Sequence, residues 1–538
     1  MENGHSYDEK PHHPAPDVTK QQRLPKSFRA LKDSSDAPAH QRTLIICLDG
    51  TGDQFDNDNS NIVHFVSCLK KHSPDKQVTY YQSGIGTYDH GGLQNGIGAA
   101  MDMAVGSGLG IHVKDAYKFL MQNYRDGDKI CLIGFSRGAY TVRCLAGMLR
   151  KVGLLPASNG SQVNFAYDFY KNNSENGQKL SEEFKKTFCT DVDVYFLGLF
   201  DCVASVGFLP RKLPFSKEAS NTVRYFRHAM ALDEHRAKFK VCHWQHELGD
   251  VGATNGGIQR RGTVDFTPGA RVKHAMGLDL PKMKKAKQEA ASGDESDDTW
   301  ASKFREQEKR NRALQDFTTD AMEVWFMGAH ADIGGGAVKN ESRHMLSRIP
   351  LRWMIRQCFE CDTGILFDMA KLAEQGLEVA TLWPKYRKPS IPSGDNRPPA
   401  ALMTKYKKGV LAPIQRHSTF LPIGPFDNRV SDAPTQDELN YILPSETDED
   451  HFDAMEQPHD QLVEAKGWWV LEVWPIKVRI LSKDKMGWEK RVRMNLGRYR
   501  PIRSRRPNMH WTVQHQIDKG MYRLRTREPD GTSWHHIA

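Results

Sequence analysis

Residues 129–153 read KICLIGFSRGAYTVRCLAGMLRKVG, and this stretch decides the fold. Its apolar start predicts a buried strand, and the helical period of its second half predicts a helix that ends at Gly153. Ser136 lies between them, with Gly134 and Gly138 at the positions where larger side chains would clash across a sharp turn. The pattern GxSxG is common by chance. Its place between a strand and a helix favours a serine nucleophile over a serine in a structural turn.

Other parts of the chain repeat this alternation of strand and helix. Short runs rich in branched and aromatic residues predict further buried strands at 43–48, 77–81, 192–200 and 323–328. The helical period of residues 111–124 predicts a helix before Ser136. Strands that alternate with helices form parallel sheets covered on both faces. The predicted fold class is therefore α/β, with a doubly wound and mostly parallel sheet.

The composition divides the 538 residues into three parts. Residues 1–40 are rich in His, Pro, Asp and Lys, which predicts a disordered tail. Residues 41–370 hold the strand and helix pattern, interrupted by a charged stretch that predicts an exposed insertion at about 281–313. Residues 371–538 are basic and rich in Trp. We expect them to form a C-terminal extension that packs on or beside the α/β domain.

The nine cysteines are odd in number and lie mostly in apolar runs, which is typical of buried thiols in a reducing compartment. Cys358 and Cys361 form a CxxC without a second pair, so we expect no zinc site. No stretch reaches about 18 uninterrupted apolar residues. We expect a soluble, cytoplasmic protein, with the nucleus as the second location.

Polar residues follow four of the predicted strands. Asp49, Ser136, Asp201 and His330 each stand where a strand ends, and open parallel sheets place their sites beyond the carboxyl ends of the strands. A serine hydroxyl needs a base, and the base needs an acid that orients it. The chain order of Ser136, Asp201 and His330 is the order of nucleophile, acid and histidine in α/β-hydrolases. Asp332 is an alternative acid, although it lies close to His330 in sequence.

The segment CLDGTG, residues 47–52, is similar to the phosphatase motif DxDGT, but Cys47 stands where that motif has its nucleophilic aspartate. We therefore predict an oxyanion loop, with backbone N–H groups from Arg137 and from the small residues Gly50, Thr51 and Gly52. Asp49 would anchor this loop. The acidic spacing here lacks the features of a calcium loop, and the Gly-rich pieces near 84–110 lack the nucleotide-binding patterns. We expect no metal and no cofactor.

Five blocks of sequence, taken in order, resemble a known family: LIICLDGTGD, GFSRGAYTVRCLAGML, LGLFDCVASVG, VRYFRHAMALDEHR and VWFMGAHADIGGG. Over roughly residues 43–355 the chain resembles the α/β-hydrolase family of the type VI secretion phospholipase effector catalytic domain, and its tail and basic C-terminal region resemble fungal members. The resemblance implies a serine lipase or esterase, with Ser136 as nucleophile, Asp201 as acid and His330 as base. The chain departs from the family at Cys202, where a threonine is common, and in its long insertion.

The charge of the chain is concentrated in one place. The formal net charge of the chain is +9. Residues 477–506 contain twelve Lys and Arg but only two acidic residues, Asp484 and Glu489. Such a stretch, interleaved with aromatic residues, can lie on an anionic membrane surface. Nucleic acid or nuclear import is the less favoured use of these charges, and a solvated face is the simplest.

These observations predict a serine hydrolase that cleaves acyl esters through an acyl-enzyme and resembles a phospholipase or lipase, with a lipid or small-molecule ester as substrate. The competing interpretation is a catalytically idle protein that keeps the fold for binding or as a scaffold. Acyl-chain length, headgroup, positional specificity and oligomeric state stay open.

Overall fold

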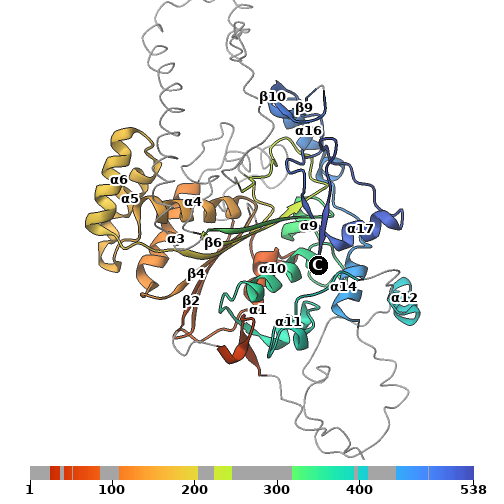
Figure 1. The fold of residues 1–538 in the computed structure, drawn as a ribbon, viewed down its shortest axis with the longest axis horizontal. Helices are drawn as coiled ribbons and strands as arrows, with labels where there is room; N and C mark the ends of the chain where they lie inside the picture. Colours follow the sequence, from red (N-terminus) through yellow and green to blue (C-terminus); the bar gives the residue numbers. More distant parts are fainter. Residues whose placement is uncertain are drawn as a thin grey trace, which may run out of the picture.

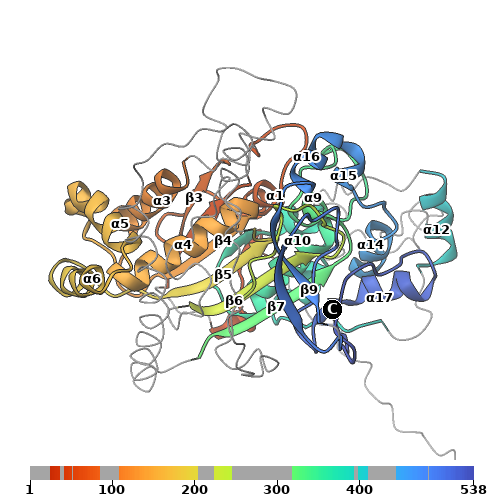
Figure 2. The same ribbon diagram turned by 90° about the horizontal axis from the view of Figure 1, so that it is seen from above.

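An eight-stranded parallel sheet forms the centre of the molecule (Figures 1 and 2). The computed structural model describes residues 25–36, 41–50, 53–84, 108–203, 223–244, 318–392, 398–409, 444–482 and 484–538. The strand order is β12-β11-β7-β6-β5-β4-β2-β3, and every neighbouring pair is parallel. The strands are β2 (Thr43–Leu48), β3 (Gln77–Gln82), β4 (Lys129–Phe135), β5 (Val194–Phe200), β6 (Val223–Ala231), β7 (Asp320–Phe326), β11 (Asn508–His510) and β12 (His535–Ile537).

Helices cover both faces of this sheet (Figure 1). Along β2, Leu44 and Ile46 pack into one hydrophobic cluster and Ile45 and Cys47 into another, because successive side chains of a strand point to opposite faces. The first cluster holds α3 (Leu109–Asn123), α4 (Ser136–Val152), α5 (Val163–Lys171) and α6 (Glu175–Phe188), and the second holds α1 (Asn61–Cys68), α10 (Arg348–Glu360) and α11 (Met369–Glu374). The predicted doubly wound α/β fold is confirmed.

Strand β6 lies between β5 and β7 and was not among the strands predicted from the sequence. Its run contains Arg227 and His228, both buried, which break the apolar pattern that marked the other strands. Arg227 is paired with Asp320 and donates to Gln357. The tertiary structure thus supplies partners that let charged residues occupy a central strand.

The C-terminal region contributes to the sheet itself, because β11 pairs with β7 and β12 pairs with β11. Its other elements lie along one side of the sheet (Figure 2). They are α12 (Ala400–Lys407), α14 (Glu446–Asp453), α15 (Gln461–Glu464), α16 (Trp469–Glu472), the antiparallel pair β9 (Ile476–Leu481) and β10 (Trp488–Arg493), and α17 (Trp511–Asp518).

The smaller elements complete the described chain. Strand β1 (Ser27–Arg29) pairs with β8 (Leu366–Asp368), α9 (His330–Gly334) follows β7, and 3-10 turns lie at Ser34–Asp36, Ala157–Gln162, Val379–Thr381 and Lys466–Trp468. The nine cysteines carry free thiols, and eight of them are buried. Among the described helices, none combines the length and the apolar character needed to span a bilayer. The predicted insertion at 281–313 and most of the predicted tail lie outside the described residues.

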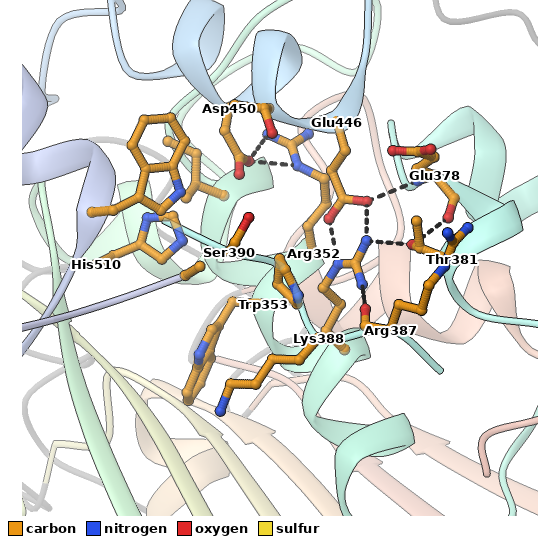
Figure 3. Close-up of a pocket in the computed structure, with 16 residues that line it drawn as sticks. Arg352, Trp353, Glu378, Thr381, Arg387, Lys388, Ser390, Glu446, Asp450 and His510 are labelled. Atoms are coloured by element: carbon orange, nitrogen blue, oxygen red, sulfur yellow. Dashed lines mark hydrogen bonds and ion pairs between the residues drawn. The ribbon is translucent and has the colours of Figure 1, made fainter. Parts of the chain in front are cut away.

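Buried ion pairs join the C-terminal region to the sheet-covering helix α10 (Figure 3). Arg352 contacts both Asp450 and Asp453 of α14 at 2.6 Å, and Arg356 forms a two-bonded pair with Glu446. A cavity of about 290 Å³ lies beside these pairs. Charges removed from water need such partners, so α10 and α14 depend on each other.

Arg352→Met should lower the free energy of unfolding by about 3–5 kcal/mol, because it leaves two buried carboxylates without their cation. Lys388→Met is the matched control, since Lys388 pairs with Glu360 at the surface and such pairs contribute about 0–1 kcal/mol. Urea unfolding of both variants measures the difference. Equal losses in the two variants would contradict a structural role for the α10–α14 ion pairs.

Candidate active site

Ser136 begins α4 directly after β4 and has a left-handed backbone conformation, with a φ of 56°. Non-glycine residues adopt this conformation rarely, and strained positions of this kind cluster at active sites. A Cβ on Gly138 would lie 2.3 Å from the carbonyl oxygen of Leu48, and a Cβ on Gly134 would lie 2.6 Å from the Cα of Ala139. The close approach of α4 to β2 and β4 therefore requires both glycines of the pattern.

The structure brings His330 and Asp201 to Ser136. His330 is the first residue of α9, just beyond β7, and its Nε2 lies 2.7 Å from the Oγ of Ser136. Its Nδ1 lies 2.5 Å from Oδ2 of Asp201, which directly follows β5. All three side chains are buried. The three residues predicted from the strand ends thus form one continuous hydrogen-bonded chain, and their catalytic roles stay a prediction.

The charge of Asp201 determines which nitrogen of His330 carries the proton. Burial alone would raise the pKa of Asp201, but the Arg500 guanidinium and the His330 hydrogen bond outweigh burial and hold it well below its usual range. An ionised carboxylate only accepts hydrogen bonds, so Nδ1 of His330 donates to Asp201. Its Nε2 is left as an acceptor for the hydroxyl of Ser136.

The surroundings of His330 favour its neutral form. Burial lowers the pKa of this imidazole, and the hydrogen bond with Asp201 offsets only part of that effect. The rings of Phe135 and Phe239 lie 4.8 Å from the imidazole ring, one tilted and the other edge-on. Contact with these two rings leaves little of His330 exposed to water. A neutral, oriented imidazole next to a serine hydroxyl is what general-base chemistry requires.

Arg500 was missed as a site residue. It lies in the basic stretch 477–506, yet it is buried and contacts Asp201 with two guanidinium nitrogens, at 2.6 and 2.9 Å. The sequence offered no direct signal, because 299 positions separate the two residues. One of the twelve cations of the stretch is therefore unavailable to a membrane surface.

A second buried ion pair supports Phe239, the aromatic ring that contacts His330 edge-on. Arg236 contacts Glu234 at 2.6 Å, and its guanidinium lies 3.5 Å from the ring centre of Phe239. Burial opposes ionisation of Glu234, but Arg236 outweighs burial and lowers the pKa of Glu234 to about 2. Phe239 in turn contacts Trp468 edge-on, at 5.4 Å. The C-terminal region therefore packs directly behind His330, and the sequence did not indicate this.

The predicted oxyanion loop is only partly described, since Thr51 and Gly52 lie outside the described residues. The N–H of Gly50 donates to Asp49 at 2.9 Å, so it is not the free donor that we expected. Asp49 also accepts hydrogen bonds from Ser60 and Tyr81, as an anchor of this segment would. Burial raises the pKa of Asp49 to about 6.

Arg137 is the second residue of α4, a position whose backbone N–H has no acceptor within the helix. That N–H stays our prediction for an oxyanion donor. The Arg137 side chain is buried, and burial lowers its pKa to about 10 although Asp53 acts in the opposite direction.

Asp332, the alternative acid, contacts a different histidine. Its Oδ1 lies 2.7 Å from Nδ1 of His459, and its Oδ2 accepts hydrogen bonds from the backbone N–H groups of His459 and Ala329. The hydrogen bond with Asp332 raises the pKa of His459. Asp332 thus ties the loop around His330 to the C-terminal region.

The cavity of Figure 3 is separate from Ser136, Asp201 and His330. Within the described ranges, no three His, Cys, Asp or Glu side chains gather as a metal ion would need. The cavity is lined by residues of α10, α14 and neighbouring segments, such as Trp353, Arg387 and His510, and includes none of Ser136, Asp201 and His330.

The chain is similar to a yeast protein and to two proteins of known structure. It is 27% identical over 578 residues to the uncharacterized protein YEL023C of Saccharomyces cerevisiae, covering 91% of this chain and 80% of that protein. An uncharacterized protein from Pseudomonas aeruginosa is 15% identical over 70% of this chain, with a TM-score of 0.30. The Tle1 effector bound to the VgrG spike of the type 6 secretion system is 18% identical over 57%, with a TM-score of 0.28. The chain spans about half of either solved structure.

The sequence model of one family covers most of the α/β part. The family is described as "T6SS, Phospholipase effector Tle1-like, catalytic domain", and its match runs over residues 42–357, more than half of the chain. The matched range contains Ser136, Asp201 and His330 and ends before α14. The chain therefore belongs to the family of Tle1-like phospholipase effector catalytic domains.

Proposed function

We propose that this protein is a serine carboxylic-ester hydrolase of the phospholipase or lipase type. One observation carries the proposal: Ser136, His330 and Asp201 form a buried hydrogen-bonded chain, with the serine on a strained turn between a strand and a helix. Membership of a phospholipase effector family supports a lipid ester as the substrate class.

The reaction would begin when the Oγ of Ser136 attacks the ester carbonyl carbon while Nε2 of His330 takes the hydroxyl proton. Asp201 stabilises the imidazolium that forms. The N–H of Arg137, near the N-terminus of α4, would donate to the developing oxyanion. His330 then protonates the leaving alcohol, which leaves the acyl group on Ser136. In the second half of the reaction His330 takes a proton from water, the water oxygen attacks the acyl carbonyl carbon, and His330 returns the proton to Ser136 as the acid is released.

Ser136→Ala should lower esterase turnover by a factor on the order of 10⁶, because the nucleophile is lost. The fold should stay intact, since the substitution removes only one oxygen atom. Hydrolysis of a soluble short-chain ester and labelling by a fluorophosphonate probe measure this change. Ser181→Ala is the matched control, since Ser181 is a buried serine whose hydroxyl bonds within α6.

The same labelling experiment separates the enzyme from the alternative of an idle scaffold. A scaffold would neither hydrolyse the ester nor take the probe at Ser136. Wild-type turnover in Ser136→Ala would instead assign the activity to another residue.

The rate should fall as the pH is lowered, because only neutral His330 accepts the serine proton. Since the pKa of His330 lies below its usual value, kcat/KM should reach half of its maximum at a pH below about 6.5 and its full value at higher pH. The pH profile on a soluble ester measures this midpoint. A midpoint above 7, or an unchanged profile in His330→Ala, would contradict the assignment of the base.

We further propose that the protein meets its substrate at an anionic lipid surface through the β9–β10 hairpin and the segment after it. This part exposes Val492, Met494 and Leu496 beside Arg491 and Arg493. Cations near an anionic surface contribute about 1 kcal/mol each, and apolar side chains add burial in the interface.

Replacing Lys485, Arg491 and Arg493 with Gln should weaken binding to anionic vesicles by at most about 3 kcal/mol, while turnover of a soluble ester stays unchanged. Vesicle cosedimentation at low and high salt measures the binding. The control replaces Lys171, Lys179 and Lys186 on α5 and α6, and these helices lie at the left edge of Figure 1, away from β9 and β10 at its top. Equal binding by both triple variants would contradict the hairpin as the contact surface.

A further inference from the structure

We infer that Arg500 is a positioning residue of this active site: it fixes the carboxylate of Asp201 in the plane and charge state that orient His330. The inference rests on the proposed hydrolase function. It also goes beyond the family match, because Arg500 lies 143 positions after the last matched residue, 357.

The guanidinium of Arg500 has an acceptor for every one of its five N–H groups. Two of its nitrogens contact the two oxygens of Asp201, at 2.6 and 2.9 Å. The three remaining N–H groups, one on each nitrogen, donate to the carbonyl oxygens of Ala231 and Phe239 at 2.6 to 3.1 Å. A planar fork of this kind specifies both the position and the rotation of a carboxylate.

The backbone around Arg500 is held against the wall of the active site. Tyr499 stacks on His235 with ring centres 4.7 Å apart, and Nδ1 of His235 donates to the carbonyl oxygen of Gly497. On the other side, the backbone N–H of Ile502 donates to the carbonyl oxygen of Arg527. Arg500 is therefore placed by contacts that precede and follow it.

Asp201 has little else to compensate its charge. It has no exposure to solvent, and its remaining hydrogen bonds come from the N–H of Ala231 and from His330. A buried carboxylate without its cation is protonated more easily and can rotate about its side-chain bonds. Either change removes the acceptor that holds the His330 proton on Nδ1.

The charges facing His330 set the direction of the expected pH effect. They are Asp201 and Glu234, which raise its pKa, and Arg236, which lowers it, with Arg500 on the far side of Asp201. Loss of the Arg500 cation leaves more negative charge near the imidazole. If Asp201 stays ionised, the pKa of His330 rises and the acid limb of the rate profile moves to higher pH.

The test compares Arg500→Gln, Arg500→Lys and the control Arg523→Gln, all in the full chain on a soluble ester. Arg523 is exposed and lies outside the stretch 477–506. We expect Arg500→Gln to lower kcat about 10- to 1,000-fold with a smaller change in KM, because the residue orients the base without touching substrate. Arg500→Lys, which keeps the charge without the fork, should restore the acid limb and only part of kcat. Arg523→Gln should match the wild type.

Active-site titration with a fluorophosphonate corrects each rate for the folded fraction, so a loss of protein is not counted as a loss of catalysis. Combining Arg500→Gln with Asp201→Asn supplies the decisive comparison. If Arg500 acts through Asp201, Arg500→Gln should lower kcat by less than about threefold when Asp201 is already replaced by Asn.

Two outcomes overturn the inference. One is a wild-type kcat and pH profile in titrated Arg500→Gln, and the other is an equal loss with and without the Asp201 carboxylate. A wild-type protein that neither hydrolyses the ester nor takes the probe would instead reject the proposed hydrolase function.

Discussion

The charge on Asp201 is the constraint on which the arrangement of this protein depends. The carboxylate has no exposure to water, and burial of an isolated charge is costly unless a partner of opposite charge is present. Strand β5 ends at that carboxylate and α9 supplies the imidazole, but the compensating cation comes from Arg500. The α/β part therefore needs the C-terminal region to balance the charge at its own centre.

The same dependence recurs at several other contacts. Glu472 of α16 accepts hydrogen bonds from Ala237 and Asn495, in the segments that carry Phe239 and Arg500. His459 holds Asp332 in the loop of His330, and α14 supplies the carboxylates that pair with Arg352 of α10. The contacts of Glu472 with Ala237, of His459 with Asp332 and of α14 with Arg352 join residues more than 90 positions apart in the chain, so the family-matched part and the rest form one body around the site.

Local patterns were enough to predict the strands β2, β3, β4, β5 and β7 and the candidate triad. Ser136, Asp201 and His330 each follow an apolar run, and parallel strands bring their carboxyl ends to one edge of the sheet. The GxSxG pattern also predicted the need for the turn glycines. In the structure Gly138 lies so close to the backbone of Leu48 that no side chain would fit. In contrast, β6 contains buried polar residues, and the short strands β11 and β12 have too few residues for any period to show. Arg500 was counted among surface cations because its partner is distant in sequence.

The position of β11 has a consequence for the newly made chain. Strand β7 ends at Phe326, and the strand that covers its open edge starts only at Asn508. At translation rates of about 5–20 residues per second, the ribosome needs roughly 10–40 s to make the intervening polypeptide. Throughout that interval the backbone N–H and C=O groups along β7 stay unpaired and can template strand addition by another chain. The sheet therefore gains protection at this edge only after residues 508–510 have been made and have paired with β7.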